Sequence, residues 1–165
     1  MSMSPALNHY LAAQQLRYDI LSHPHTSNSL SSAYAAHIEP EKVAKAVVVK
    51  HGNHYSMCVI PASHQLILEW LEYEQQLSFE MADEQELRGL FPDCELGAIP
   101  CVGQAFNMDV IVDTALMDKQ DLYFEGGDHR HLVHMESRSF RSMMEDAWQA
   151  VISCPIYDEF GDVVH

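Results

Sequence analysis

The fold is decided by the stretch Val43-Ala-Lys-Ala-Val-Val-Val-Lys50, which is followed by His51-Gly-Asn-His54 and by Tyr55-Ser-Met-Cys-Val-Ile60. The first and third pieces are rich in β-branched and other apolar residues, which favour strands. The middle piece contains asparagine and glycine, which tight turns between two strands prefer. These residues therefore predict a β-hairpin. Pro61 cannot donate a ladder hydrogen bond, so we expect it to close the second strand.

Helical and extended patterns alternate on both sides of this hairpin. Helices are expected from Pro5 to about Arg17, from a cap at Thr26, Ser27 or Asn28 to about His37, over 65–73 and 84–91, and from Ser137 or Ser139 through Trp148 and Val151. Short strands are expected at 18–21, 77–80, 108–112, 122–124 and 132–135, with one turn at 39–42 and a loop at 94–104. This mixture predicts one α+β domain around a sheet over residues 1–154, and a frayed tail at 155–165.

The charge of the chain limits the molecules that it can bind. Its 165 residues carry 24 acidic and nine basic side chains, a formal net charge of −15, while 47% of the residues are hydrophobic. Such a chain folds around a core, and it repels both phosphate backbones and anionic membranes at long range. The acid is concentrated in residues 69–128, which hold 15 acidic residues against Arg88 and Lys119. Residues 1–50 and 129–141 are neutral or slightly basic, so only these segments can approach nucleic acid.

No targeting or cysteine motif is present. The first residues lack the basic and apolar regions of a signal peptide, and no apolar run approaches the length of a membrane span, so we expect a cytoplasmic protein. The four cysteines form no C-x-x-C pair, which favours reduced thiols over a zinc or redox site.

Lys45 stands out within the hairpin because apolar residues flank it on both sides. On a strand it shares a face with Val43, Val47 and Val49, where a lysine must extend to solvent, pair with an acid or serve a site. The alternative is an edge-strand lysine that prevents aggregation.

Two further segments could carry chemistry. The loop from Gly97 to Gly103 contains two glycines and Pro100, and its backbone N–H groups could face a ligand, although an ordinary turn has the same composition. His129 and His131 are two residues apart, which places them on one face of a strand, as some metal sites require. No other ligand has suitable spacing, so alternating polar residues on a strand are the simpler interpretation.

Five segments in order resemble the YbaK family, the freestanding relatives of the prolyl-tRNA synthetase editing domain. The resemblance extends from about Leu7 to Trp148. Its segments are Ser22-His-Pro-His-Thr-Ser27, Val43-Ala-Lys-Ala-Val-Val-Val49, Gly97-Ala-Ile-Pro-Cys-Val-Gly103, Val110-Ile-Val-Asp-Thr-Ala-Leu116 and Phe124-Glu-Gly-Gly-Asp-His129. The resemblance implies a YbaK-like single domain with a curved, mixed, largely antiparallel sheet, surrounding helices and a pocket on one side.

The resemblance also implies an aminoacyl-tRNA deacylase, which hydrolyses the ester of a wrong amino acid on tRNA. Lys45 matches the lysine most often tied to activity in the family. The implied substrate-binding residues are His25, Gly97, Ala98, Ile99, Pro100, Cys101, Gly103, Asp113, Gly127 and His129. Relatives often have a second proline where this chain has Cys101, which affects the expected amino-acid specificity.

From these residues we expect a trans-editing hydrolase for small amino acids such as Cys, Ala or Ser. Aminoacyl esters are reactive, so positioning and charge stabilisation suffice, with Lys45 at the terminal phosphate or oxyanion and help from the ribose 2′-hydroxyl. His25 and His129 would contact the nucleotide or a water. No metal or cofactor is expected. The expected partner is the 3′ end of aminoacyl-tRNA, together with an aminoacyl-tRNA synthetase; DNA and membranes are not expected, and the chain should be monomeric.

Three other functions stay open. A non-catalytic small-molecule or nucleotide-binding module of the same fold predicts a cavity beside Lys45 that side chains fill. A protein-interaction domain using the acidic segment predicts a basic partner released by salt. Hydrolysis by a metal on the histidines predicts sensitivity to a chelator.

Overall fold

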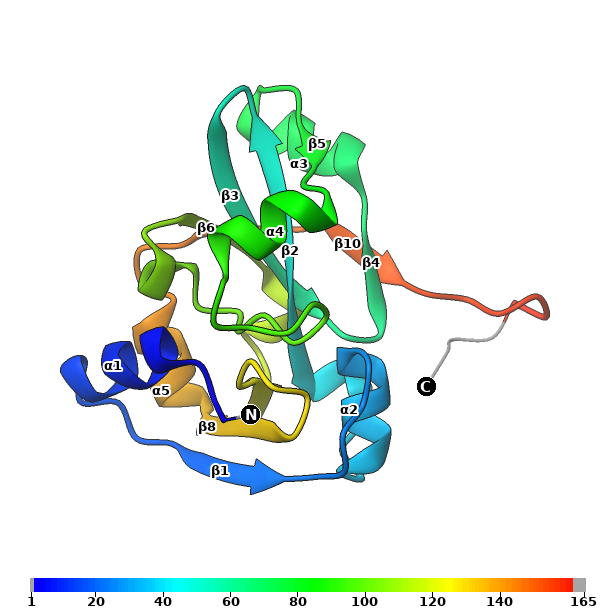
Figure 1. Cartoon of the computed structure of the whole chain (residues 1–165). Helices are drawn as coiled ribbons and strands as arrows, with labels where there is room; N and C mark the ends of the chain where they lie inside the picture. The colour runs from blue at the N-terminus through cyan, green and yellow to red at the C-terminus, as the bar shows by residue number, and fades with distance from the viewer. Residues whose placement is uncertain (1, 162–165) are drawn as a thin grey trace.

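The structure, a computed structural model, describes residues 2–161 (Figure 1). Its α-helices are α1 Pro5–Ala13, α2 Ser29–Ala35, α3 Leu68–Gln75, α4 Glu84–Leu90 and α5 Ser137–Met143, and its 3-10 turns are η1 Pro40–Lys42, η2 Gly103–Phe106 and η3 Thr114–Leu116. Its strands are β1 Asp19–Ser22, β2 Val43–His51, β3 His54–Pro61, β4 His64–Leu66, β5 Glu80–Met81, β6 Asp109–Asp113, β7 Asp121–Glu125, β8 His131–Glu136, β9 Trp148–Ala150 and β10 Ser153–Pro155. Residues 162–165 of the expected tail lie outside the described part.

One mixed sheet organises the molecule, which confirms the α+β prediction. Its strand order is β1-β8-β7-β2-β3-β6-β9, with β5 as an additional neighbour of β2, while β4 and β10 form a separate pair. The pairs β2–β7, β3–β6 and β6–β9 are parallel, and the other pairs of this sheet are antiparallel. The predicted hairpin is confirmed as β2 and β3, which pair from Ala44–Pro61 to His51–His54.

Strand β2 has a break in the pairing along one of its edges. β3 covers one edge along nearly its whole length. On the other edge, β7 pairs only with Val43 and Ala44, and β5 pairs only with Val49 and Lys50. The residues between these contacts have no strand neighbour on that edge within residues 2–161, although Val48 O still accepts a hydrogen bond from Ala82 N at 3.0 Å. This gap leaves room for a cavity at the centre of the sheet.

Both faces of the sheet are covered. Along β3, Met57 and Val59 belong to the larger core cluster, whereas Cys58 and Ile60 belong to a second cluster on the opposite face, and all four are fully buried. Burial raises the pKa of the Cys58 thiol to about 12, and all four cysteines are free, as expected for reduced thiols. No helix of the described chain is long and apolar enough to cross a membrane.

Two of the expected helices are wrong in part because long-range pairing overrides local pattern. The segment expected as a helix over 65–73 starts with β4, whose Leu66 pairs with Ser153 of β10, and only then continues as α3. The final helix was expected through Trp148, but it ends at Met143 and Trp148 pairs with Ile111 of β6. The first helix ends at Ala13, before Gln15 adopts a left-handed backbone with φ of 54°.

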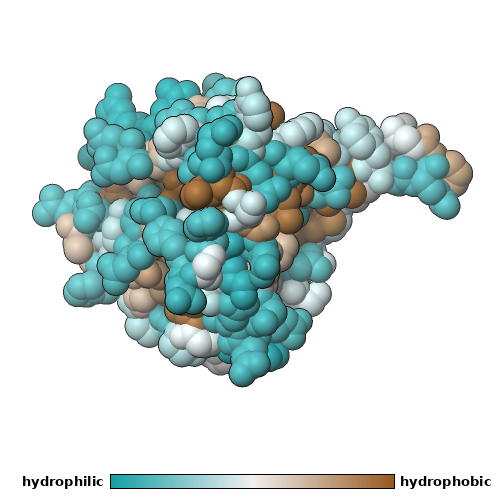
Figure 2. Space-filling model, turned by 90° about the horizontal axis from the view of Figure 1, so that it is seen from above, coloured by the Kyte–Doolittle hydropathy of each residue, from teal (hydrophilic) through white to brown (hydrophobic). Residues whose placement is uncertain are grey.

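Hydrophilic residues cover most of the face seen in Figure 2, and hydrophobic residues gather near its centre. Local capping places the short helices between the strands. Asp83 and Glu86 form a reciprocal capping box at the start of α4, and Asn28 accepts a hydrogen bond from Ser31 N at the start of α2. These two caps fix the helices that flank the gap in the sheet.

His134 joins three strands of the sheet through its two ring nitrogens. Nδ1 lies 3.2 Å from Asp19 of β1, Nε2 lies 2.8 Å from Asp121 of β7, and Tyr123 stacks on the ring. Partial burial lowers the pKa of His134, but the hydrogen bonds to Asp121 and Asp19 outweigh it, so the pKa is raised above 6.5. In its charged form, the imidazolium of His134 can donate one hydrogen bond to each carboxylate.

We predict a pH-dependent loss of stability from His134. Because its folded pKa is raised, its contribution is complete below pH 6.5 and disappears as pH rises through the folded value. The melting temperature of His134→Gln should therefore lie furthest below wild type near pH 5.5, and the gap should narrow as pH rises through the folded pKa. The control His54→Gln removes an exposed contact to Asp109, which solvent screens, and should show little change across this range. A constant difference between His134→Gln and wild type would contradict the assignment.

Glu125 is a buried carboxyl at the end of β7. It is 1% exposed, and neither of its oxygens has a hydrogen-bond partner. Burial raises its pKa to about 7, the nearby Ser32 hydroxyl offsets part of this shift, and the charge of Asp128 adds to it. The Ser32 hydroxyl lies 2.7 Å from the Thr26 hydroxyl, and it makes no hydrogen bond of full geometry with Glu125.

We expect Glu125→Gln to become relatively more stable than wild type as pH rises. The folded state keeps the Glu125 proton, so wild type loses stability between the ordinary pKa of 4.5 and about 7, by on the order of 3 kcal/mol in all. Glutamine cannot ionise, so the gap in unfolding free energy should move in its favour across this interval, measured by denaturant titration. Exposed Glu84→Gln is the control. A gap independent of pH would show that Glu125 does not titrate in this range.

Candidate functional site

A cavity of about 240 Å³ occupies the gap beside β2. The lining residues come from four parts of the chain and are Asn28, Ser29, Lys45, Ala46, Val47, Val48, Met81, Ala82, Leu87, Gly97 and Ile99. In Figure 1, α4 lies across β2 and α2 lies near its lower end. Only three of the residues proposed from the sequence line this space: Lys45, Gly97 and Ile99. Nothing in the local sequence pattern identified the contributions of α2, α4 and β5, because tertiary packing brings them together.

Lys45 lies between this cavity and a second one. The second cavity, of about 540 Å³, is lined by Lys45, Val47 and Met81 together with residues of β4 and α3. The ammonium of Lys45 has no hydrogen-bond or ion-pair partner within residues 2–161, and burial lowers its pKa. An anion that bound here would offset this desolvation and favour the charged form again. The position therefore suits an anionic ligand better than a structural ion pair.

The glycine-proline loop reaches the cavity with its first residues only. Gly97 has φ of +83°, and a Cβ added there would lie 2.6 Å from the Ser27 carbonyl oxygen, so the close approach requires glycine. The backbone N–H groups of Gly97 and Ile99 have no acceptor in the described chain, whereas Ala98 N donates to Glu95 O at 3.1 Å. Both residues line the cavity.

The remainder of the loop packs into the core. Ala98 and Cys101 are fully buried, Pro100 is buried, and burial raises the pKa of the Cys101 thiol well above its usual range. A Cβ on Gly103 would meet Val110 at 2.7 Å, which places that glycine against β6. These contacts support the loop from behind, and these residues do not line the cavity.

His129 and His25 lie together beside Gly97. The His129 ring contacts the Leu96 carbonyl oxygen through Nε2 at 2.5 Å, and its Nδ1 is buried without a partner. His25 packs edge-on against it with ring centroids 5.5 Å apart, and its Nε2 lies 3.2 Å from Glu95. Although neither ring lines the cavity, both stand behind the loop that does.

Backbone hydrogen bonds fasten these segments to one another. Thr26 N donates to His129 O at 3.2 Å, and Glu95 N donates to Gly127 O at 2.8 Å. Gly127 has φ of +113°, and a Cβ there would lie 3.2 Å from Ser4. These hydrogen bonds join three segments that are far apart in sequence into one support behind the Gly97 loop. Gly127 contributes to it through its backbone carbonyl.

Asp113 lies elsewhere, at the end of β6. Its carboxylate accepts hydrogen bonds from Ile152 N at 3.0 Å and from the Ser153 hydroxyl at 2.7 Å, and it caps η3. Because Ser153 donates to Asp113, its oxygen accepts from His64 Nδ1 at 2.9 Å. Burial lowers the pKa of His64, and the charge of Lys45 lowers it further, whereas the charge of Asp113 raises it. The local sequence around His64 gives no sign of this contact, because its neighbour Ser153 is 89 residues away.

Among residues 2–161, no three His, Cys, Asp or Glu side chains are placed to hold a metal ion. His131, which alternates with His129 in sequence, points its Nδ1 to Asp128 at 2.6 Å. The two histidines therefore have separate partners.

Comparison with solved structures shows where this fold occurs. Hypothetical protein APE2540 superposes with a TM-score of 0.80 at 20% identity, covering 90% of this chain and 99% of that one. A protein described as a candidate trans-editing enzyme for prolyl tRNA synthetase gives 0.77 at 19% identity, covering 93% and 99%. A candidate signal transduction protein from Marinobacter aquaeolei VT8 gives 0.72 at 14% identity, covering 90% of this chain but 30% of that one. At these identities the likeness shows the fold.

Comparison with sequences shows the family. No curated protein matches the chain significantly. The model of the aminoacyl-tRNA editing domain matches residues 23–143, which include Lys45, the Gly97 loop and His129. With this match over most of its length, and with the fold described above, the chain belongs to the aminoacyl-tRNA editing domain family.

Proposed function

We propose that the chain is a trans-acting deacylase that hydrolyses the ester between a small amino acid and the 3′-terminal ribose of tRNA. The observation that carries this proposal is the unpartnered ammonium of Lys45 at the boundary of two open cavities. Side chains do not fill the space beside Lys45. A non-catalytic binding module with a filled site fits this arrangement less well.

The two cavities suit the two parts of the substrate. The smaller one, about 240 Å³, has apolar walls from Val48, Leu87 and Ile99 and lies below the volume range of pockets that hold drug-sized ligands. It fits the aminoacyl group of Cys, Ala or Ser and excludes large side chains by size. The larger one, about 540 Å³, would take the terminal nucleoside, with Gln65 and Glu69 of its wall offering polar groups.

Hydrolysis in this arrangement needs positioning and charge stabilisation. A water attacks the ester carbonyl carbon, the carbonyl oxygen becomes an oxyanion, and the ribose oxygen leaves as the C–O bond breaks and takes a proton. The N–H groups of Gly97 and Ile99 are the candidates to hold the carbonyl oxygen, and Lys45 would stabilise the oxyanion or the terminal phosphate. The neighbouring 2′-hydroxyl of the ribose can relay the proton, so no protein nucleophile is required.

Replacement of Lys45 by alanine should reduce deacylation by about a hundredfold or more, as removal of one oxyanion donor does in other enzymes. The assay uses Cys-, Ala- and Ser-tRNA, with wild type, Lys45→Ala and the control Lys42→Ala. Lys42 lies immediately before β2 and pairs with exposed Glu39, so its variant should keep full activity. Full activity of a folded Lys45→Ala protein would refute the role of this lysine.

Alanine substitution at Gly97 and Gly89 should have opposite effects on stability. At Gly97 the positive φ and the 2.6 Å approach to Ser27 O should cost more than 1 kcal/mol and displace the loop, so stability and deacylation both fall. Gly89 lies within α4 with nothing within 4 Å of an added Cβ, and there alanine should stabilise by about 0.5–1 kcal/mol. Calorimetry measures the stability of the two variants, and the tRNA assay measures their deacylation. Equal activity of Gly97→Ala and wild type would remove the loop from the mechanism.

A further inference from the structure

The basic side chains of the protein divide into two groups. Four of the nine are in ion pairs with carboxylates, namely Lys42, Lys50, Arg88 and Lys119, and Arg141 donates to the Met117 carbonyl oxygen. The head groups of Lys45, Arg17, Arg130 and Arg138 have no such partner in the described chain. In a chain of net charge −15, the cations without a carboxylate partner are the ones free to meet an anionic ligand, so their positions are informative.

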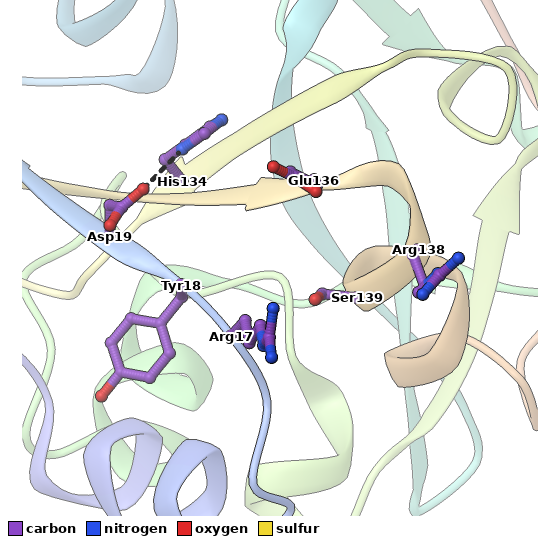
Figure 3. Close-up of a pocket in the computed structure, with 7 residues that line it drawn as sticks. All are labelled: Arg17, Tyr18, Asp19, His134, Glu136, Arg138 and Ser139. Atoms are coloured by element: carbon purple, nitrogen blue, oxygen red, sulfur yellow. Dashed lines mark hydrogen bonds and ion pairs between the residues drawn. The ribbon is translucent and has the colours of Figure 1, made fainter.

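Two of these cations share a cavity of about 740 Å³ at the start of β1. Arg17 enters from the segment between α1 and β1, and Arg138 from the first turn of α5. In the view of Figure 3, the Ser139 side chain lies between those of Arg17 and Arg138. Both arginines are exposed, so their guanidinium groups are free to accept an anion from solvent.

The acids in this cavity make no ion pair with either arginine within residues 2–161. Asp19 accepts from His134 at 3.2 Å, as the dashed line in Figure 3 shows, and His134 also binds Asp121 outside the cavity. The Glu136 side chain also lines the cavity, and its carboxylate makes no ion pair within residues 2–161. The arginines are therefore the groups available for a ligand, and Ser139 adds a hydroxyl donor.

The third unpaired arginine lies at the other end of the same strand pair. β1 and β8 pair from Asp19–His134 to Ser22–His131, and Arg130 comes immediately before β8. Arg130 O accepts a hydrogen bond from His23 N at 2.9 Å, which fixes its backbone beside β1. In Figure 1, β1 runs along the lower part of the molecule from the side of α1 and α5 to α2. The line of arginines thus leads toward Asn28 and Ser29, which line the Lys45 cavity.

We propose that Arg17, Arg138 and Arg130 form a track for the phosphodiester backbone of an RNA whose 3′ end occupies the Lys45 cavity. The inference rests on the proposed function for the identity of that RNA. Arg17 and Asn28 are 11 residues apart, so the chain between them spans at most about 40 Å. At the spacing of a duplex DNA strand, roughly 3.4 Å per nucleotide, this upper limit corresponds to about a dozen nucleotides. An isolated phosphate would engage only one end of the track.

The test measures RNA binding without turnover. A fluorescent acceptor-stem hairpin with an uncharged single-stranded CCA end is titrated with wild type and with Arg17→Gln/Arg138→Gln at several salt concentrations. We expect Arg17→Gln/Arg138→Gln to bind the RNA about five- to tenfold more weakly than wild type at low salt. The slope of log K against log salt should be smaller in magnitude for this variant by about 1 to 2. The variant Arg17→Lys/Arg138→Lys keeps the charge and should keep the slope.

The control variant Lys42→Gln/Arg88→Gln removes the same charge from ion pairs outside the cavity and should change binding less than twofold. Equal effects of the two glutamine variants would overturn the track. A free-anion site would replace the track under two conditions. Millimolar inorganic phosphate would displace the RNA, and Arg17→Gln/Arg138→Gln would lose as much affinity for phosphate as it loses for RNA.

A second readout separates this inference from the proposed function. With a charged hairpin as substrate, Arg17→Gln/Arg138→Gln should raise KM and leave kcat unchanged, because these residues lie away from the ester. Arginine-dependent RNA binding without hydrolysis of any aminoacyl ester would refute the deacylase and retain the track. If Arg17→Gln/Arg138→Gln hydrolyses the ester with the same KM as the control variant, the track is refuted and the deacylase is retained.

Discussion

The incomplete pairing of β2 is the constraint on which the rest of the site depends. β3 holds one edge of this strand along nearly its whole length, while β7 and β5 hold only the two ends of the other edge. A continuous strand at that edge would occupy the place of the cavity. Because the ends are fixed, the open middle keeps a defined shape, and Lys45 is held in a rigid strand with its ammonium at the boundary of two cavities.

The wall opposite Lys45 is maintained mainly by backbone contacts. Gly97 approaches the Ser27 carbonyl more closely than any other residue type could, and Gly127 O accepts from Glu95 N. Backbone hydrogen bonds depend little on side-chain identity, so such a wall can keep its geometry while the side chains behind it vary. Cys101 illustrates this, because it is fully buried behind the loop and does not line the cavity.

Local interactions explain which elements were predictable. The β2–β3 hairpin and helix α4 are set by residues close in sequence, and both were predicted. β4 and β9 were missed because their partners, β10 and β6, lie far away in the chain. At the site, Lys45 was visible as a charged residue within an apolar strand. Asp113 matched a family segment, but its contacts are to Ile152 and Ser153, and only the fold reveals His64 in the same network.

The distribution of ion pairs reconciles an acidic chain with an RNA substrate. Within the acidic segment 69–128, both cations are paired with neighbouring acids, Arg88 with Glu84 and Lys119 with Asp118, so no free positive charge stays there. Glu86 is also occupied, by Lys50 and Tyr55. The cations without partners follow the β1–β8 pair and end at Lys45. Repulsion from the rest of the surface then disfavours other approaches of a phosphate backbone, so net negative charge restricts how an RNA can bind rather than preventing it.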